Sequence, residues 1–280
     1  MQATWHDRRG VAVWDVARPA RPGRVPGVDM AGFRDRGASP AGHRVVPHPG
    51  VTLVVEFGAG PLLVEHSAGR EHRGSLVAGP GFGAGAVRVR GERFEAVQVR
   101  LSPPAARAIL GASPAESGGA VLALDDLWGR EAERVRERLA GAPSWEERFA
   151  LVEAVLARRG EAAEPVDPEV ARAWERILAA RGLVRVEDLA AEVGWSRRRL
   201  WSRFRSQIGL PPKRAARLVR FDRAAHRLAA GEEAARVAAE GGYSDQSHLH
   251  RDGAEFTGAT PAAVAGEPFL AVDGIAWSGR

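Results

Sequence analysis

The chain contains no cysteine, a single tyrosine, and only one lysine among its 40 basic residues. Without cysteine it cannot form disulfides, thiolate metal sites or an active site built on a cysteine nucleophile. No apolar run approaches the ~20 residues that a membrane span needs, and residues 1–10 lack the apolar core of a signal peptide. We therefore expect a cytoplasmic protein that does not associate with membranes.

The first hundred residues are rich in glycine and proline and predict short strands. At 280 residues the chain is also longer than the commonest single-domain size of ~100–150 residues, so two domains are expected. The expected strands cover residues 51–57, 62–65, 76–78, 86–90 and 94–101. This pattern predicts a small β sandwich or barrel at the amino-terminal end.

Helices are predicted to follow the strands. Ser102 and Pro103 form a cap and first turn for a helix over 105–110, and Ser144 with Glu147 forms a capping box for a helix over 145–159. From Pro168 the pattern is helical, beginning with an apolar stripe over 168–180 that consists of Val170, Trp174, Ile177 and Leu178. The fold class is thus α+β, with a first domain over 1–159, a linker over 160–167, an all-α domain over 168–268 and a tail over 269–280.

Positive charge is concentrated in one segment. Between residues 195 and 227 eleven basic residues accompany the single acid Asp222, a net charge of +10 in a chain whose total is +5. Lysine and arginine that neutralise phosphates release counterions, so a polyanion is the simplest partner for this segment. A solvated helix face explains the charge equally well when charge is considered alone.

An internal repeat occupies the same region. Residues 190–196 read AAEVGWS and residues 238–244 read AAEGGYS, at an offset of 48 residues. Gly194 and Gly242 suit a sharp turn, and Ser196 and Ser244 suit the cap of the helix that follows. Two short helices joined by a tight turn make a helix-turn-helix unit, in which the second helix enters the major groove. The duplication predicts two such units.

The stretch 186–223 and the later stretch 237–261, which contains the run GYSDQSH, resemble the two motifs of the AraC/XylS family of transcription regulators. The resemblance covers about residues 168–268. It implies two three-helix subdomains joined by one long helix over 212–230, and two recognition helices in successive major grooves ~34 Å apart. The implied partner is double-stranded operator or promoter DNA.

The family positions imply which side chains meet DNA. In the first recognition helix, over 196–206, Leu200 and Phe204 are expected to face the core, which leaves a different set of residues facing DNA. Base contacts are implied for Arg198, Trp201 and Ser202, although a buried Trp201 is the alternative. Arg198 can bridge guanine O6 and N7. The DNA-facing residues of the two helices are Ser196, Arg197, Arg198, Trp201, Ser202, Arg205, Gln246, Ser247, His248, His250 and Arg251. Ser247 and His248 are expected to contact phosphate or to support the helix.

The second unit, with a recognition helix over 245–254, departs from the family pattern. Gly253 stands where the first unit has Phe204, and the family usually has a large apolar residue there. Glycine costs ~1 kcal/mol of helix propensity, and a missing core aromatic costs ~3–5 kcal/mol unless neighbours fill the space. We expect the second unit to be the less stable one. Arg185 replaces the expected Ser or Thr cap, and Ala215 replaces a frequent Tyr.

The amino-terminal domain resembles the cupin-like domains of actinobacterial regulators, on the strength of residues 97–111 and 122–130. Family members use such domains for sensing a small molecule or for dimerisation. An apolar ligand cavity and an ordinary core are both open uses for its aromatic residues, which are Trp14, Phe33, Phe57, Phe82 and Phe94. The spacing of its histidines, His43, His48, His66 and His72, lacks a close pair on one strand face and argues against a metal.

No catalytic motif stands out. Gly81, Gly83 and Gly85 are not followed by Lys and Ser or Thr, so they do not form a phosphate-binding loop, and no cofactor or metal is expected. We predict a non-enzymatic, sequence-specific transcription regulator that forms a homodimer and has RNA polymerase as a candidate partner. The alternatives are a metal-dependent cupin enzyme with a DNA-binding tail and a protein that binds nucleic acids without sequence preference.

Overall fold

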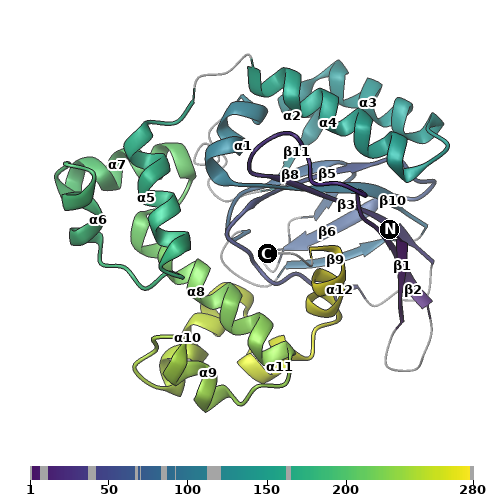
Figure 1. Cartoon of the computed structure of the whole chain (residues 1–280). Helices are drawn as coiled ribbons and strands as arrows, with labels where there is room; N and C mark the ends of the chain where they lie inside the picture. The colour runs from purple at the N-terminus through teal and green to yellow at the C-terminus, as the bar shows by residue number, and fades with distance from the viewer. Residues whose placement is uncertain are drawn as a thin grey trace.

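The computed structural model describes residues 2–6, 12–36, 42–66, 69, 71–82, 87–91, 93–111, 121–161 and 165–277. Its class is α+β, as predicted, with antiparallel sheets in the amino-terminal part and helices in the carboxy-terminal part (Figure 1). Gly83, Gly85, Ala86 and residues 162–164 of the expected linker lie outside the described residues.

Two antiparallel sheets form the amino-terminal sandwich. The seven-stranded sheet has the order β1-β2-β3-β10-β5-β8-β11 and the four-stranded sheet the order β4-β9-β6-β7. The strands are β1 (Gln2–His6), β2 (Ala12–Ala17), β3 (Val28–Asp35), β4 (His43–Arg44), β5 (Val51–Glu56), β6 (Leu62–His66), β7 (Glu71–Arg73), β8 (Leu76–Ala78), β9 (Val87–Gly91), β10 (Glu95–Leu101) and β11 (Val121–Ala123).

The five predicted strands are present, but the described residues contain six others that the sequence analysis missed. Strand β3 was overlooked because Ala31 and Gly32 interrupt its apolar pattern, although its residues 28–34 pair with the whole of β10. The two faces of the larger sheet differ in what they bury. Val51, Leu53 and Val55 pack against helices, whereas Val54 packs toward the four-stranded sheet.

Among the residues that the structure describes, four helices complete this part: α1 (Pro103–Leu110), α2 (Leu124–Trp128), α3 (Arg130–Gly141) and α4 (Trp145–Glu161). The predicted caps are confirmed, because the Ala105 amide donates to Ser102 Oγ at 3.4 Å and the Glu147 amide to Ser144 Oγ at 3.2 Å. Helices α2, α3 and α4 cover the larger sheet (Figure 1). Helices α2 and α3 were not predicted.

From Pro168 to Ala276 the regular elements of the described chain are all helices. They are α5 (Pro168–Ala179), α6 (Val186–Glu192), α7 (Arg197–Ile208), α8 (Pro212–Ala229), α9 (Ala234–Glu240), α10 (Gln246–Thr257), α11 (Pro261–Ala265) and α12 (Pro268–Ala276). Helices α5 to α7 pack on the first half of α8, and α9 to α11 pack on its second half (Figure 1). The predicted stripe of α5 is buried except for Leu178, which is 42% exposed.

No helix among the described residues is long and apolar enough to cross a bilayer.

Candidate nucleic-acid interface

The two helix-turn-helix units share one turn geometry and differ in how the second helix is capped. Gly194 and Gly242 both adopt left-handed backbone angles, with φ of 70° and 72°. In the first unit the Arg199 amide donates to Ser196 Oγ at 3.2 Å, which is the predicted cap. In the second unit the prediction of Ser244 is wrong, because Asp245 accepts from the His248 amide at 2.7 Å. An aspartate offers the more strongly accepting oxygen at this position.

The first recognition helix, α7, exposes the predicted side chains. Leu200 and Phe204 are completely buried in the core of the first unit, and this fixes the opposite face toward solvent. Trp201 is 45% exposed, so the alternative of a buried Trp201 is wrong. The guanidinium of Arg205 lies 5.2 Å from its ring centroid. The exposed set on this helix includes Arg197, Arg198, Trp201, Ser202 and Arg205.

The second recognition helix, α10, exposes Gln246, Ser247, His250 and Arg251. His248, by contrast, is partly buried against the edge of the Tyr243 ring, with centroids 5.2 Å apart. Its Nδ1 lies 3.4 Å from Ser244 Oγ and its Nε2 lies 3.4 Å from Arg220 Nη2. Because Arg220 can only donate, Nε2 is the acceptor and Nδ1 carries the proton. These contacts make His248 a support for the helix.

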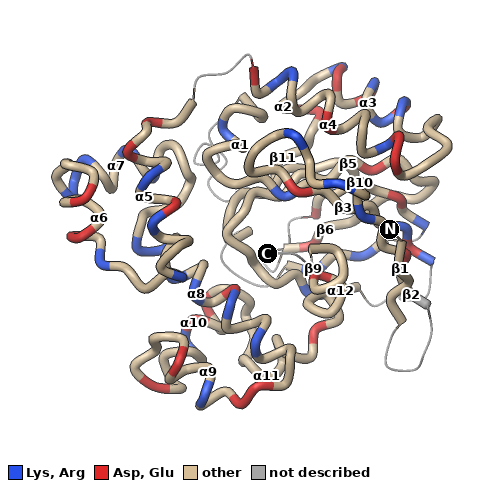
Figure 2. Tube along the Cα trace, in the orientation of Figure 1, with Lys and Arg blue, Asp and Glu red and all other residues tan. Residues whose placement is uncertain are grey.

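Ion pairs neutralise much of the basic cluster, and Figure 2 shows acidic positions interspersed with the basic ones in this part of the fold. Arg203 binds Asp167 through two hydrogen bonds of 2.7 and 2.8 Å, and Arg227 binds Glu232 at 2.6 Å and Glu240 at 2.5 Å. The net charge counted from the sequence therefore overstates the unpaired positive charge that this surface presents to a polyanion. Within the described chain, the cluster members that make no ion pair are Arg198, Arg199, Arg205, Lys213 and Arg223.

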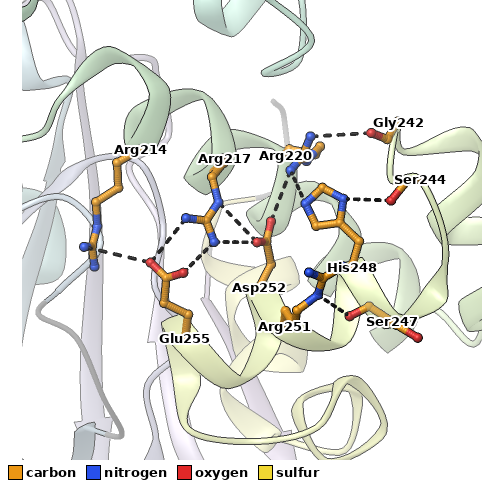
Figure 3. Close-up of polar contacts among 10 residues, drawn as sticks. All are labelled: Arg214, Arg217, Arg220, Gly242, Ser244, Ser247, His248, Arg251, Asp252 and Glu255. Atoms are coloured by element: carbon orange, nitrogen blue, oxygen red, sulfur yellow. Dashed lines mark hydrogen bonds and ion pairs between the residues drawn. The ribbon is translucent and has the colours of Figure 1, made fainter.

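A buried carboxylate joins α8 to α10 (Figure 3). Asp252 is 1% exposed and accepts from Arg217 at 2.6 Å and from Arg220 at 3.3 Å. Arg217 also binds Glu255 at 2.5 Å, and Arg220 covers the ring of Tyr243 at 4.4 Å. Burial, together with the charge of Asp252, raises the pKa of Tyr243 to about 12. This network fixes the orientation of α10 relative to the long helix α8.

The sequence analysis missed Asp252 and Glu255 as members of the site. A signal was available, because Asp252 lies between Leu249 and Phe256 on the apolar face of the predicted helix. A charged residue on such a face requires a buried partner. The arginines that supply it lie 32 and 35 residues earlier in the chain.

The space left by Gly253 is filled by its neighbours. A Cβ at this position would lie 3.3 Å from the carbonyl oxygen of Ala259 and 3.5 Å from Pro261. The core aromatic has moved one helical turn to Phe256, which is buried and stacks on Phe221 with centroids 5.3 Å apart. The second core thus differs from the first in the position of its buried aromatic residue. The weak cap at Arg185 is confirmed, because its side chain makes no capping hydrogen bond.

A cavity of about 80 Å³ lies between the two sheets of the sandwich. Trp14, Phe33, Phe82 and Phe94 line it, as the ligand-cavity hypothesis requires, whereas Phe57 packs against Trp145 instead. Polar groups of the lining come from His48, Thr52 and Gln98. Phe269, on α12, reaches the cavity from the carboxy-terminal part of the chain.

Three of the four histidines considered as metal ligands have other partners. His43 packs edge-on against Trp14 at 4.6 Å, and burial lowers its pKa. His48 Nδ1 accepts from the Gly50 amide, and its Nε2 lies 2.8 Å from Thr52 Oγ1. His72 Nε2 lies 3.3 Å from the Ser75 carbonyl. Across the described ranges, no three His, Asp or Glu side chains come together as metal ligands do.

Comparison with known proteins supports the assignment of the helical part. Residues 189–266 match the family described as "Helix-turn-helix domain". No curated protein matches the chain by sequence. Residues 189–266 are therefore a helix-turn-helix domain, and the class of protein that such a domain indicates is the DNA-binding transcription regulators.

Several solved structures are similar. ToxT from Vibrio cholerae O395 is 9% identical, covers 86% of this chain and 98% of its own, and gives a TM-score of 0.45. The C-terminal domain of AraT, a response regulator from Geobacillus stearothermophilus, is 19% identical over 36% of this chain and 85% of its own, with a TM-score of 0.34. The AraC-like transcriptional activator CuxR is 15% identical over 69% and 80%, with a TM-score of 0.27.

Proposed function

We propose that this protein is a non-enzymatic transcription regulator that reads a two-part DNA site with α7 and α10. The observation that carries the proposal is the exposed face of α7, where Arg198 and Trp201 remain open to solvent while Arg203, Arg217 and Arg227 are engaged by acids. A guanidinium without an internal partner is free to form the bidentate pair with guanine.

The DNA-binding domain is proposed to cover 168–268 and the sensing domain 1–159. The long helix α8 joins the two units, so their recognition helices are expected to read half-sites about one helical turn apart. The proposed DNA contacts are Ser196, Arg197, Arg198, Trp201, Ser202, Arg205, Gln246, Ser247, His250 and Arg251, with His248 as a support.

The sandwich is proposed to bind a small, largely apolar effector in the cavity between its sheets. Aromatic side chains supply most of the contact surface, and His48, Thr52 and Gln98 supply polar groups that can orient a ligand. We propose that the regulator works in the cytoplasm as a homodimer that acts together with RNA polymerase. Calorimetry against a panel of metabolites tests the sensing role, and the absence of both heat and a melting shift would refute it.

Selection of bound sequences from a random DNA pool tests the reading function. We expect two conserved half-sites, and we expect Arg198→Ala to lose ~1–3 kcal/mol of discrimination at one base pair. Lys213→Ala is the matched control. Lys213 is exposed, and the loss of a cation that contacts only phosphate should lower the affinity for all DNA sequences alike. A wild-type pool without a consensus, together with a steep salt dependence, would instead establish nonspecific binding.

A further inference from the structure

Helix α12, which follows the DNA-binding domain in the chain, packs on both domains (Figure 1). Leu270 belongs to the apolar core of the second helix-turn-helix unit. Val272 and Ala276 belong to a different core, which they share with β2 and β3 of the sandwich. One short helix therefore contributes side chains to the interior of each domain.

A buried ion cluster holds α12 at this junction. Asp273, which is 6% exposed, binds Arg100 of β10, and its other oxygen lies 3.4 Å from Nε2 of His226 in α8. Burial alone would raise the pKa of Asp273, but Arg100 and His226 hold it well below its ordinary value, so the carboxylate is charged. The three residues come from the sandwich, α12 and the long helix, which makes this cluster a three-way connection.

The same helix reaches the cavity. Phe269 lies one helical turn before Asp273 and lines the cavity together with Gln98, which is two residues before Arg100 on β10. Residues two apart on a strand share a face, and residues four apart on a helix do likewise. The contact of α12 with the cavity and its contact with Arg100 are therefore adjacent on the same faces of the two elements.

The size of the cavity makes this contact relevant to ligand binding. At about 80 Å³ it is smaller than the ~150 Å³ that accommodates benzene in an engineered protein cavity. A ligand of that size or larger exceeds this inner space, so it either extends through the opening of the cavity or displaces part of the lining. Phe269 is the lining residue that lies on a short terminal helix, whereas Trp14, Phe33 and Phe94 belong to or adjoin the strands of the sandwich.

One polar group of the cluster is left unsatisfied in the docked position. Arg100 is 4% exposed and its Nε has no hydrogen-bond partner, although the ring of Trp277 lies 4.4 Å from its guanidinium. An unsatisfied buried donor lowers the stability of the docked form relative to a released one. This is the arrangement expected of a contact that opens.

We propose that α12 couples the cavity to the DNA-binding domain: a ligand that displaces Phe269 also releases Asp273 from Arg100 and His226, and so loosens the second helix-turn-helix unit from the sandwich. The proposal rests on the proposed sensing function and specifies its regulation. Arg44 binds Glu267 at 3.0 Å, and Val46 packs in the core of the second unit, so the interface that α12 controls includes β4 and the segment after it.

The natural absence of cysteine makes opening of this interface measurable in the full chain. Val46→Cys places a single thiol in the interface, where the residue is 3% exposed, and its labelling rate reports separation of the domains. Val97→Cys places the thiol in the sandwich core, where labelling requires unfolding of the first domain. Both rates are measured with an aromatic disulfide reagent under native conditions.

Phe269→Ala and Asp273→Asn are each expected to accelerate labelling at position 46 about tenfold or more, with no change at position 97. Phe94→Ala is the matched control for the first, because it enlarges the same cavity from the sandwich side, and the exposed Asp126→Asn is the control for the second. Neither control should change the labelling rate at position 46.

The inference is overturned if both test variants label at the wild-type rate, or if Phe94→Ala accelerates labelling as much as Phe269→Ala. Equal acceleration at positions 46 and 97 also overturns it, because the fold would then be lost instead of the contact. These readouts need neither DNA nor effector. Failure of the sensing function would appear separately, as a chain that shows the labelling differences but binds no metabolite.

Discussion

Asp252 offers a direct test of the network that joins α8 to α10. Removing its carboxylate by Asp252→Ala leaves Arg217 and Arg220, which are 28% and 13% exposed, without their shared partner. Breaking a buried ion pair costs ~3–5 kcal/mol, and because Arg217 keeps Glu255 we expect roughly 2–4 kcal/mol here. The loss should be confined to the second helix-turn-helix unit.

Hydrogen exchange read at the amides of α10, together with urea unfolding, measures this loss. Glu255→Ala is the matched control, because Glu255 is 37% exposed and its removal should cost ~1 kcal/mol or less. DNA affinity should fall for Asp252→Ala even at temperatures where the chain remains folded, since the angle of α10 is no longer fixed. Equal effects of the two substitutions, or protection lost first in α7, would refute the role assigned to Asp252.

Two further predictions concern the helix-turn-helix cores and pH. Phe204→Ala and Phe256→Ala should each cost ~3–5 kcal/mol, with the loss of hydrogen-exchange protection confined to the unit that contains the residue. Because neighbours fill the space beside Gly253, only the ~1 kcal/mol of helix propensity lost at this glycine should make the second unit of the wild type exchange faster, and equal protection would contradict that expectation. The hydrogen bond with Asp273 raises the pKa of His226 to about 9, so its stabilising contribution is complete below pH 6.5 and is lost as pH rises through 9. The melting temperature of His226→Gln should therefore approach that of the wild type at alkaline pH, and a constant difference from pH 6 to 10 would count against the ion pair.

The helix-turn-helix units were predictable because their signals are local. A period of 3.6 residues places Leu200 and Phe204 on one face, so the exposure of Arg198 on the other follows from the sequence alone, whereas the structure decided between an exposed and a buried Trp201. The turn glycines and the Ser196 cap were identified for the same reason. Helix α3 also carried such a signal in Ala132, Val135 and Leu139, which the sequence analysis did not use.

Contacts between distant segments were decided by the tertiary structure. The sequence determined that positive charge is dense between residues 195 and 227, but only the fold showed that Asp167, Asp252 and Glu240 neutralise part of it. The junction at α12 shows this clearly, because Asp273 and Arg100 are 173 residues apart and Arg44 and Glu267 are 223 residues apart. Local propensity and periodicity contain no information about such pairs, since their energy arises only after packing has removed both charges from water.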